Sequence, residues 1–298
     1  MPQLLDAVGS DLENTVVSFI PNTAETAFYG FMDGLRMSRR HQVKRELLEM
    51  WETGKLDEAR LEGLIMKNWP RSEKIAHKDI KSRTFIAQEE GRDQLVSSVY
   101  DITYEIVKPT DTLVVLDDSI VRGTTLKQSI LRILARTNPK RIVVVSTAPQ
   151  IRYPDCYGID MSESGKFIAF QAAIALLQEN HQHDLILRTF ALCEEEVKKP
   201  AAKQRNVVKD IYAPFTDVQI SAKVAELVRP KDSVWSGRVD VIYQTISDLH
   251  AALGPEAGDW YFSGDYPTPG GTATANEAYI RYHRGLKGRP YELFTSAQ

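Results

Sequence analysis

The feature that most constrains this chain is a short run near its middle, from Val114 to Thr125, which reads VVLDDSIVRGTT. Three apolar residues lead into two adjacent carboxylates, Asp117 and Asp118, and a loop with one serine and one glycine then leads into two threonines. An apolar run that stops at a polar loop is typical of a buried strand, and threonines after a tight turn are typical of a helix start. The run therefore predicts a strand, a loop and a helix in that order.

The chemistry of this order suits a phosphorylated sugar. Carboxylates at the carboxyl end of a strand can accept hydrogen bonds from neighbouring ribose hydroxyls, or bind a divalent cation through oxygen. Gly123 would let the backbone approach a ligand closely, and Thr124 and Thr125 would offer amides and hydroxyls at a helix N-terminus, where phosphate binds well. Ribose 5-phosphate carries a vicinal diol and a phosphate at a suitable spacing.

A purely structural explanation exists for each part of the run. Asp117 and Asp118 could cap a turn, and Thr124 or Thr125 could cap a helix, as in many α/β proteins. For a pair of aspartates alone, that explanation would be the simpler one. Four features in the order that one ligand requires favour the binding site instead.

The run and its flanks resemble a known family. The run itself is similar to the phosphoribosyl pyrophosphate (PRPP) signature of type I phosphoribosyltransferases, and its flanks look like those of amidophosphoribosyltransferases. The resemblance is strong over residues 16–30 and 81–162 and weak elsewhere. The other segments that carry it are Phe19–Thr23, Ala27–Gly34, Arg83–Ile86, Ala148–Pro154, Tyr157–Asp160 and the aromatic segment Trp260–Gly271.

The resemblance implies an α/β protein with the type I phosphoribosyltransferase fold, in which helices cover both faces of a central, mostly parallel sheet. Residues 1–298 would form one phosphoribosyltransferase domain, with a helical insertion at 36–70 and a C-terminal extension at 194–298. The implied activity is transfer of the phosphoribosyl group of PRPP to ammonia, which gives 5-phosphoribosylamine and pyrophosphate in the first step of purine synthesis. The implied cofactor is Mg²⁺.

The resemblance also assigns roles to residues of the run. Asp117 and Asp118 would hold the ribose hydroxyls and help to place Mg²⁺, and both are candidate catalytic residues. Thr23, where the family has a serine, would also lie near the metal. The loop would cradle the 5′-phosphate through a set of substrate-binding candidates, namely Ser119, Arg122, Gly123, Thr124 and Thr125.

Three basic residues upstream complete the predicted site. Lys81 and Arg83 stand at the start of the family's Arg-Thr-Phe-Ile strand, where they would contact pyrophosphate, and Arg83 is a further catalytic candidate. Both residues could instead be charges at the edge of a strand, and for Lys81 this alternative is equally favoured. Arg92 matches an arginine of the loop that is expected to close over PRPP, residues 88–108.

The chain departs from the family in that loop. Relatives place several lysines and arginines there, whereas residues 93–101 contain none, and Asn22 replaces an aspartate near the metal. These changes imply a weaker grip on pyrophosphate, so binding of PRPP is expected more firmly than its turnover. A non-catalytic module that binds PRPP or purine nucleotides and regulates a partner is therefore the alternative function.

The family also carries an N-terminal glutaminase domain, which begins with a cysteine and releases ammonia from glutamine. This chain begins with Met1-Pro2-Gln3 and soon reaches its first predicted strand. Two expectations stay open: the chain is the C-terminal half of a longer protein, or it is a free-standing domain that uses ammonia or a separate glutaminase subunit. Further partners implied by the family are purine nucleotides as inhibitors and other copies of the chain in a homo-oligomer.

Composition argues against three further classes of protein: iron–sulfur proteins, nucleic-acid-binding proteins and membrane proteins. The chain has two cysteines, Cys156 and Cys193, whereas the iron–sulfur cluster of some family members needs about four thiolates, so no cluster is expected. A formal net charge of −3 argues against general nucleic-acid binding. No apolar run reaches roughly 18 residues and no signal-peptide pattern opens the chain, so a cytoplasmic protein without membrane contact is expected.

Periodicity predicts the remaining elements. Strands are expected at 15–21, 113–116 and 141–147, and helices at 23–52, 56–67, 124–136, 167–193, 218–227 and 240–253. A linker or surface loop is expected at 194–205, and an irregular Pro/Gly turn at 264–271.

The long helix predicted at 23–52 carries a basic face. Arg36, Arg40 and Lys44 follow one another at intervals of four residues, and Arg39 and Arg45 lie beside them. A solvated surface is the simpler explanation of these charges. Phosphate binding or docking of a partner is the alternative.

Overall fold

The computed structural model describes residues 2–9, 11–21, 23–66, 71–78, 100–103, 105–124, 126–156, 161–231, 234–254 and 258–288. The chain forms two compact units that alternate along the sequence. The first consists of Met1–Asp118, Arg132–Thr147 and Asp232–Ile242, and the second of Ser119–Leu131, Ala148–Lys231 and Tyr243–Gln298. The organisation into one domain with an insertion and an extension stays a prediction.

The first unit holds most of the strands. Its elements are α1 (Pro2–Ala7), β1 (Thr15–Phe19), α2 (Ala24–Glu52), α3 (Glu58–Met66), β2 (Arg71–Ser72), β3 (Ala76–Lys78), β4 (Tyr100–Ile102), β5 (Thr112–Asp117), α5 (Leu131–Ala135), β6 (Arg141–Ser146) and β7 (Arg238–Tyr243). None of the helices that the structure describes is both long and apolar enough to cross a membrane.

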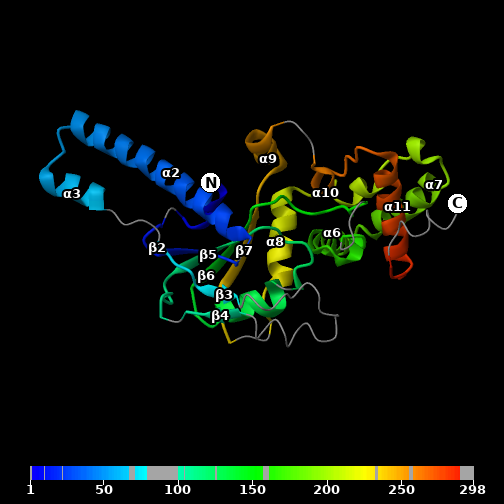
Figure 1. Ribbon diagram of the computed structural model, residues 1–298, viewed down its shortest axis with the longest axis horizontal. Coiled ribbons are helices and arrows are strands. Elements are labelled where there is room, and N and C mark those ends of the chain that lie inside the picture. Colours follow the sequence, from blue (N-terminus) through cyan, green and yellow to red (C-terminus); the bar gives the residue numbers. More distant parts are fainter. Residues whose placement is uncertain are drawn as a thin grey trace. The chain divides into compact units, whose positions relative to one another are not determined.

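Five of these strands form one sheet in the order β2-β1-β5-β6-β7 (Figure 1). β1 pairs in parallel with β2 and with β5, and β5 pairs in parallel with β6. Phe19 lies beside Leu116, and Asp117 lies beside Ser146, so the carboxyl ends of β1, β5 and β6 meet at one edge of the sheet. The predicted α/β class with a mostly parallel sheet is confirmed.

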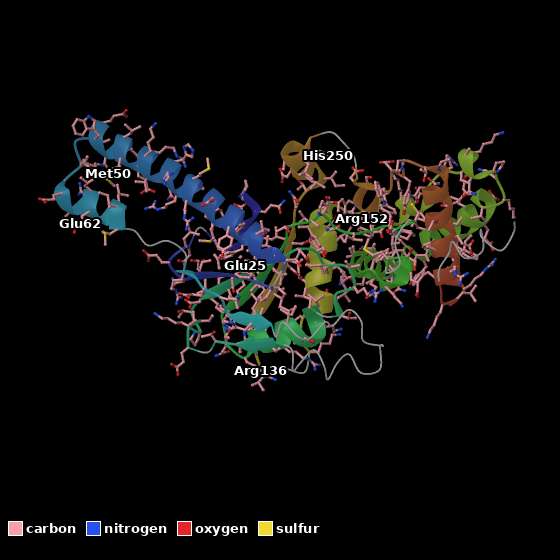
Figure 2. The ribbon with its side chains drawn as sticks, viewed as in Figure 1. Glu25, Met50, Glu62, Arg136, Arg152 and His250 are labelled. Atoms are coloured by element: carbon pink, nitrogen blue, oxygen red, sulfur yellow. The ribbon has the colours of Figure 1, made fainter. Side chains whose placement is uncertain are left out.

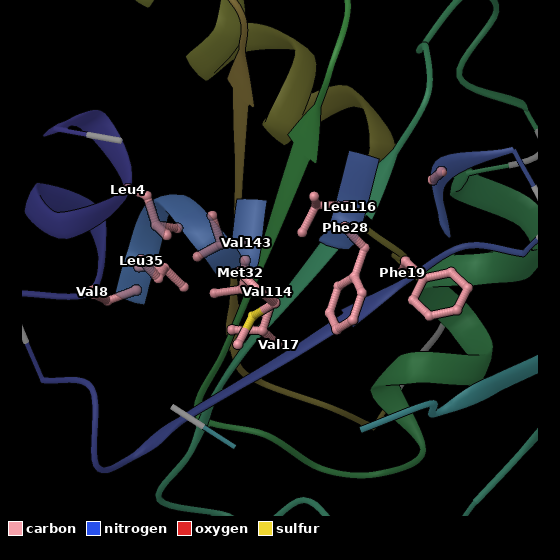
Figure 3. Packing of buried hydrophobic residues seen from close by; sticks show 11 residues of the cluster. Leu4, Val8, Val17, Phe19, Phe28, Met32, Leu35, Val114, Leu116 and Val143 are labelled. Atoms are coloured by element: carbon pink, nitrogen blue, oxygen red, sulfur yellow. The ribbon is translucent and has the colours of Figure 1, made fainter. Parts of the chain in front are cut away.

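The central strands are buried on both of their faces. One face packs on α1 and on the first part of α2 (Figure 3), in a cluster of Leu4, Val8, Val17, Phe19, Ala24, Phe28, Met32, Leu35, Val114, Leu116 and Val143. Strand residues of the opposite parity, such as Val16, Leu113 and Val144, are fully buried as well. Parallel strands covered on both faces need continuous apolar runs, which is why the sequence predicted these strands well.

One predicted helix, at 240–253, is wrong in its first part. Arg238–Tyr243 form the strand β7, in which Val239, Val241 and Tyr243 are buried in alternation. Helix α9 (Ile246–Leu253) begins only after Thr245, whose hydroxyl oxygen accepts a hydrogen bond from the N–H of Asp248 at 3.0 Å. The alternating burial has the period of a strand, and the Thr245 cap explains the later helix start.

Other element boundaries also differ from those predicted. α1 was not expected, and the helix predicted at 124–136 begins as a π-helix (Leu126–Ile130) and ends with α5 at Ala135. The turn predicted at 264–271 stops earlier, because Pro269 begins α11 (Pro269–His283). Proline is accepted in the first turn of a helix, where no N–H is needed.

The second unit is mostly helical. Besides the π-helix, α9 and α11, it contains α6 (Ile168–Glu179), α7 (His183–Glu196), α8 (Asp217–Val228), α10 (Trp260–Ser263) and short 3-10 helices at Ser164–Lys166, Ala201–Lys203 and Val207–Ile211. Phe170 of α6 is fully buried, with its ring centroid 4.8 Å from that of Tyr282 and 5.9 Å from that of Tyr279, both in α11. The rings meet edge to face, an arrangement that adds to the stability gained from burial.

The segment predicted as a linker or surface loop at 194–205 begins within α7 and continues as a largely exposed surface segment that is tied to the second unit. α7 continues to Glu196, whose carboxylate is buried and accepts hydrogen bonds from the N–H of Arg205 at 2.9 Å and from Nζ of Lys199 at 2.7 Å. A buried carboxylate needs such partners, and here they fold the charged segment back on the helix end.

Candidate functional site

Asp117 is the last residue of β5, and Asp118 is the first residue after it. The N–H of Asp118 donates a hydrogen bond to Oδ1 of Asp117 at 3.0 Å, so the loop turns directly after the strand. Both residues are half-buried. The structure therefore places the two carboxylates where the sequence predicts them, at the carboxyl end of a central parallel strand, which is the usual ligand edge of such sheets.

Thr147, at the end of the neighbouring strand β6, holds the backbone of this carboxylate pair. Its N–H donates to the carbonyl of Asp117 at 3.0 Å, and its hydroxyl donates to the carbonyl of Asp118 at 3.2 Å. Thr147 is not among the predicted site residues. The only signal was its place as the last residue of the strand predicted at 141–147.

The environment changes the acidity of Asp117. Burial, and secondly the negative charge of Asp118, raise the pKa of Asp117 from 3.8 to about 7. Two carboxylates held side by side resist ionising together, and a cation or a set of hydroxyl donors between them relieves the repulsion. Such a pair is costly without a ligand and favourable with one, which is typical of a binding site.

These donors fit a magnesium ion. Mg²⁺ is usually bound through one or two carboxylates, several waters and the phosphates of a substrate, and it does not need a complete cage of protein ligands. Within the described ranges, no group of three or more His, Cys, Asp or Glu side chains gathers around a common point. Asp117 and Asp118 could therefore hold Mg²⁺ only together with oxygens of a ligand.

Thr23 lies in the loop between β1 and α2 and is exposed. The N–H of Ile20, in the same loop, donates to the carbonyl of Leu116 at 2.8 Å, which joins this loop to the end of β5. Because β1 and β5 are parallel neighbours, Thr23 belongs to the same edge of the sheet as Asp117 and Asp118.

The loop from Ser119 to Thr124 belongs to the second unit. Ser119 and Arg122 are half-buried, Gly123 is buried, and Thr124 is exposed at the start of the helix. The N–H of Ile168 donates to the carbonyl of Val121 at 2.8 Å and fixes the middle of the loop. This loop then leads into the π-helix Leu126–Ile130, and π-helical turns often mark functional sites.

Gly123 is required by the local backbone. Its φ is +69°, a conformation that side chains disfavour, and a Cβ built there would lie 2.9 Å from Cγ1 of Ile168. The sequence predicts that glycine leaves room for a phosphate at this point. The structure gives a different reason, since the space beside Gly123 is filled by Ile168, a contact for which the local sequence pattern holds no signal.

Several predicted site residues lie outside the described residues. These are Lys81, Arg83, Arg92 and Thr125, together with Asn22 and residues 79–99 of the expected closing loop. Their roles in pyrophosphate and phosphate binding stay predictions.

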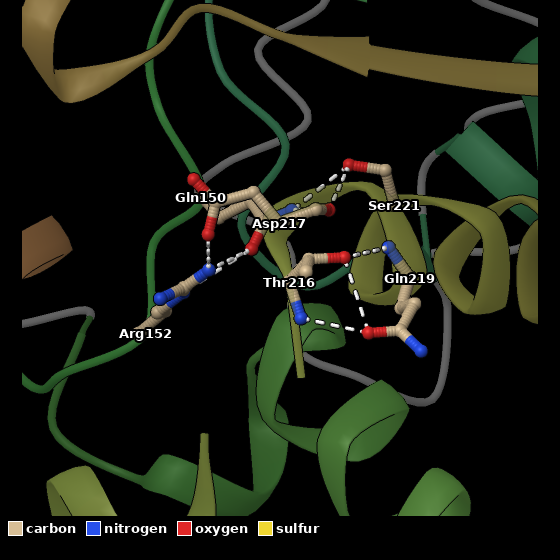
Figure 4. A network of polar contacts seen from close by, with 6 residues as sticks. All are labelled: Gln150, Arg152, Thr216, Asp217, Gln219 and Ser221. Carbon is tan, nitrogen blue, oxygen red and sulfur yellow. Dashed lines mark hydrogen bonds and ion pairs between the residues drawn. The ribbon is translucent and has the colours of Figure 1, made fainter. Parts of the chain in front are cut away.

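The segment from Gln150 to Pro154, which resembles the family, holds the second unit together (Figure 4). Nε2 of Gln150 donates to the carbonyl of Asp217 at 2.8 Å and to Oγ of Ser221 at 2.9 Å, and Arg152 forms an ion pair with Asp217. Thr216 and Gln219 form a capping box at the same end of α8. This segment therefore has a structural role at a helix N-terminus.

The same segment contacts the aromatic segment Trp260–Gly271. The N–H groups of Arg152 and Tyr153 both donate to the carbonyl of Tyr261, at 2.8 and 3.0 Å, and Tyr266 donates through its hydroxyl to the carbonyl of Pro154 at 2.6 Å. Two segments that resemble one family, and that are far apart in sequence, are thus in direct contact.

The two cysteines differ in exposure. Cys193 is buried in α7, and burial raises its pKa to about 12, whereas Cys156 is half-buried. A thiol with such a pKa is a poor nucleophile and a poor metal ligand at neutral pH.

Comparison with known proteins supports the family resemblance over part of the chain. No protein-family model matches. Curated proteins that match are the amidophosphoribosyltransferases of Haemophilus influenzae (41% identical over 90 residues, 30% of this chain and 17% of the relative), Staphylococcus epidermidis (39% over 89 residues, 30% and 18%) and Escherichia coli (44% over 57 residues, 19% and 11%). The match covers less than a fifth of the length of each of these relatives.

A solved structure similar to this one is the glutamine PRPP amidotransferase of B. subtilis in complex with ADP and GMP. Its TM-score is 0.41 at 18% identity, and the alignment covers 85% of this chain and 38% of that one. The sequence matches show that about 30% of the length of this chain is similar to part of the amidophosphoribosyltransferases.

Proposed function

We propose that this chain binds PRPP with Mg²⁺ and transfers its phosphoribosyl group to ammonia, giving 5-phosphoribosylamine and pyrophosphate. The observation that carries the proposal is the carboxylate pair Asp117–Asp118 at the end of β5. The pKa of Asp117 is raised, and the Ser119–Thr125 loop follows the pair directly. The partial identity to amidophosphoribosyltransferases supports the same reaction.

The proposed roles follow from the chemistry of the groups. Asp117 and Asp118 accept hydrogen bonds from the ribose hydroxyls and hold the sugar while C1 becomes oxocarbenium-like. Ser119, Arg122, Thr124 and Thr125 bind the 5′-phosphate, and Gly123 sets the path of their loop. Mg²⁺, when bound, would neutralise charge on the departing pyrophosphate.

Basic residues would complete the leaving-group site. Lys81, Arg83 and Arg92 are proposed to contact pyrophosphate, and Thr23 to lie near the metal. Ammonia would come from a glutaminase domain or subunit. Purine nucleotides would compete for the same ribose and phosphate contacts, the protein would act in the cytoplasm as a homo-oligomer, and no nucleic acid or iron–sulfur cluster would take part.

The test is release of pyrophosphate from PRPP and Mg²⁺, measured with and without ammonium at mildly alkaline pH. Ammonium-dependent release is expected, and Asp117→Asn with Asp118→Asn should lower it roughly a hundredfold or more. A matched control, Glu194→Gln with Glu195→Gln, removes two adjacent carboxylates on α7 and should keep full activity. Undiminished release by the aspartate variant would contradict the site.

The alternative is a non-catalytic sensor of PRPP or purine nucleotides. The observation that favours it is the absence of Lys and Arg from residues 93–101. Binding of PRPP or GMP in a calorimeter, with no pyrophosphate release under any ammonium concentration, would decide for the sensor. Loss of that binding in the aspartate variant would still locate the site.

A further inference from the structure

The second half of α2 and the helix α3 form a helical hairpin, residues 36–66, whose apolar side chains are largely uncovered. Figure 2 shows side chains projecting around it, with Met50 on α2 and Glu62 on α3. Six of the thirteen large apolar side chains that are exposed in the described part of the chain lie here: Met37, Leu48, Trp51, Leu61, Ile65 and Met66. Such a concentration on two helices marks an interaction surface.

An open groove of about 440 Å³ runs between the two helices. Its floor is apolar, and the lining consists of Arg39, Arg40, Val43, Lys44, Leu47, Leu48, Leu64 and Ile65. Arg39 is 5% exposed, and its Nη2 donates to the carbonyl of Leu64 at 3.2 Å. Nη1 of Arg39 has no hydrogen-bond partner among the described residues, so the floor holds a cation whose burial is incompletely compensated.

The two helices that border the groove carry opposite charge, with a basic rim on α2 that lines the groove and an acidic rim on α3 that lies beside it. Arg40 and Lys44 lie four residues apart on α2, beside Val43 and Leu47. Glu58 and Glu62 lie four residues apart on α3 and share a face with Leu61 and Ile65.

All four charged side chains of these rims are exposed, and none forms an ion pair with another described residue. The hairpin thus presents an apolar strip between a basic rim and an acidic rim, and that pattern is complementary to itself.

We propose that this face binds a second copy of the chain, with the two hairpins packing as a four-helix bundle. A two-fold axis along the hairpins would set α2 of one copy against α3 of the other. Arg40 and Lys44 would then pair with Glu62 and Glu58 of the second copy, in an isologous contact. Leu47, Leu48 and Ile65 of both copies would fill the centre, as apolar seams do in antiparallel bundles.

This inference is independent of the proposed activity, since it uses no residue of the candidate site. The test is sedimentation velocity of the full chain over a wide range of protein concentration. The parent chain is expected to dimerise. Leu48→Glu with Ile65→Glu should shift it to monomer, whereas Leu187→Glu, at a similarly exposed leucine on α7, should leave the dimer intact. A monomeric parent chain, or a dimer that survives the hairpin double variant, would overturn the proposal.

A charge swap tests the pairing itself. Arg40→Glu alone and Glu62→Arg alone should each weaken dimerisation about tenfold or more, because each places like charges together at two symmetric positions. The combined variant should restore the parent dissociation constant. Arg188→Glu, an exposed arginine on α7, is the control and should have no effect. Circular dichroism confirms that each variant is folded, and failure of the combined variant to recover dimerisation would exclude the proposed pairing.

Discussion

The hydroxyl of Tyr266 donates a hydrogen bond to the carbonyl of Pro154 over a distance of 2.6 Å. The bond joins the aromatic loop before α11 to the segment that follows β6 in sequence. Tyr266→Phe removes only the donor and leaves a half-buried carbonyl without it, so we expect a loss of about 1 kcal/mol of unfolding free energy. Urea denaturation measures it, and Tyr29→Phe is the control, since that hydroxyl is exposed and its 3.3 Å contact with Glu25 is weak.

Replacing Asp117 should stabilise the protein while disabling it. The folded-state pKa of Asp117 is raised from 3.8 to about 7, so the folded state binds the proton more tightly and stability falls as pH rises between these values. Asn keeps the acceptor for the N–H of Asp118 but cannot ionise. We therefore expect Asp117→Asn to unfold like the parent near pH 4 and to exceed it by about 1–4 kcal/mol at pH 8. Equal stability of the two proteins at pH 8 would contradict the raised pKa of Asp117.

The pH dependence of ligand binding should also report the ionisation of Asp117. Binding of Mg²⁺ and PRPP needs the charged form of Asp117, so affinity is expected to rise about tenfold between about pH 6 and pH 8. PRPP titrates in this range too, and Asp117→Asn isolates the contribution of the protein. Calorimetry at several pH values gives both curves, and parallel curves for parent and variant would argue against the assignment.

The conformation of Gly123 gives a further expectation. Gly123→Ala combines an unfavourable φ with a clash against Ile168, and we expect a loss of about 2–3 kcal/mol. Gly54→Ala is a matched control, because its φ of +64° is similar and nothing lies within 4 Å of its Cβ position. It should cost only about 1 kcal/mol. The difference measures the contact with Ile168, and Ile168→Val should recover part of it.

Sequence reasoning was most successful where burial and periodicity act together. The strands β1, β5 and β6 were predicted because a parallel sheet buried on both faces needs apolar runs such as TVVSF and RIVVVS. The pair Asp117–Asp118 followed from the same pattern, since the run ends where the ligand edge begins. β7 was missed because Val239, Asp240 and Val241 alternate over only six residues, which also fits the start of a helix.

The contacts around the site could not be predicted from local sequence patterns. Thr147 supports Asp117 from the next strand, and Ile168 fills the space beside Gly123 from another helix. Both contacts arise from tertiary packing, and neither leaves a mark within the run itself. The basic residues Arg40 and Lys44 stand out in the sequence, but the acidic rim opposite them does not, because Glu58 and Glu62 come to lie beside the groove only when α3 packs against α2.

The interleaving of the two units governs how the chain can be cut. In the sequence, β7 is separated from β6 by a long segment of the second unit, Ala148–Lys231, yet β7 pairs beside β6 in the sheet. A fragment that ended at Thr147 would keep four of the five strands of this sheet and would leave β6, a valine-rich strand, at an open edge. An open strand edge can pair with the edge of another molecule. Fragments of this protein that stop before β7 should therefore aggregate even when their apolar interior is well packed.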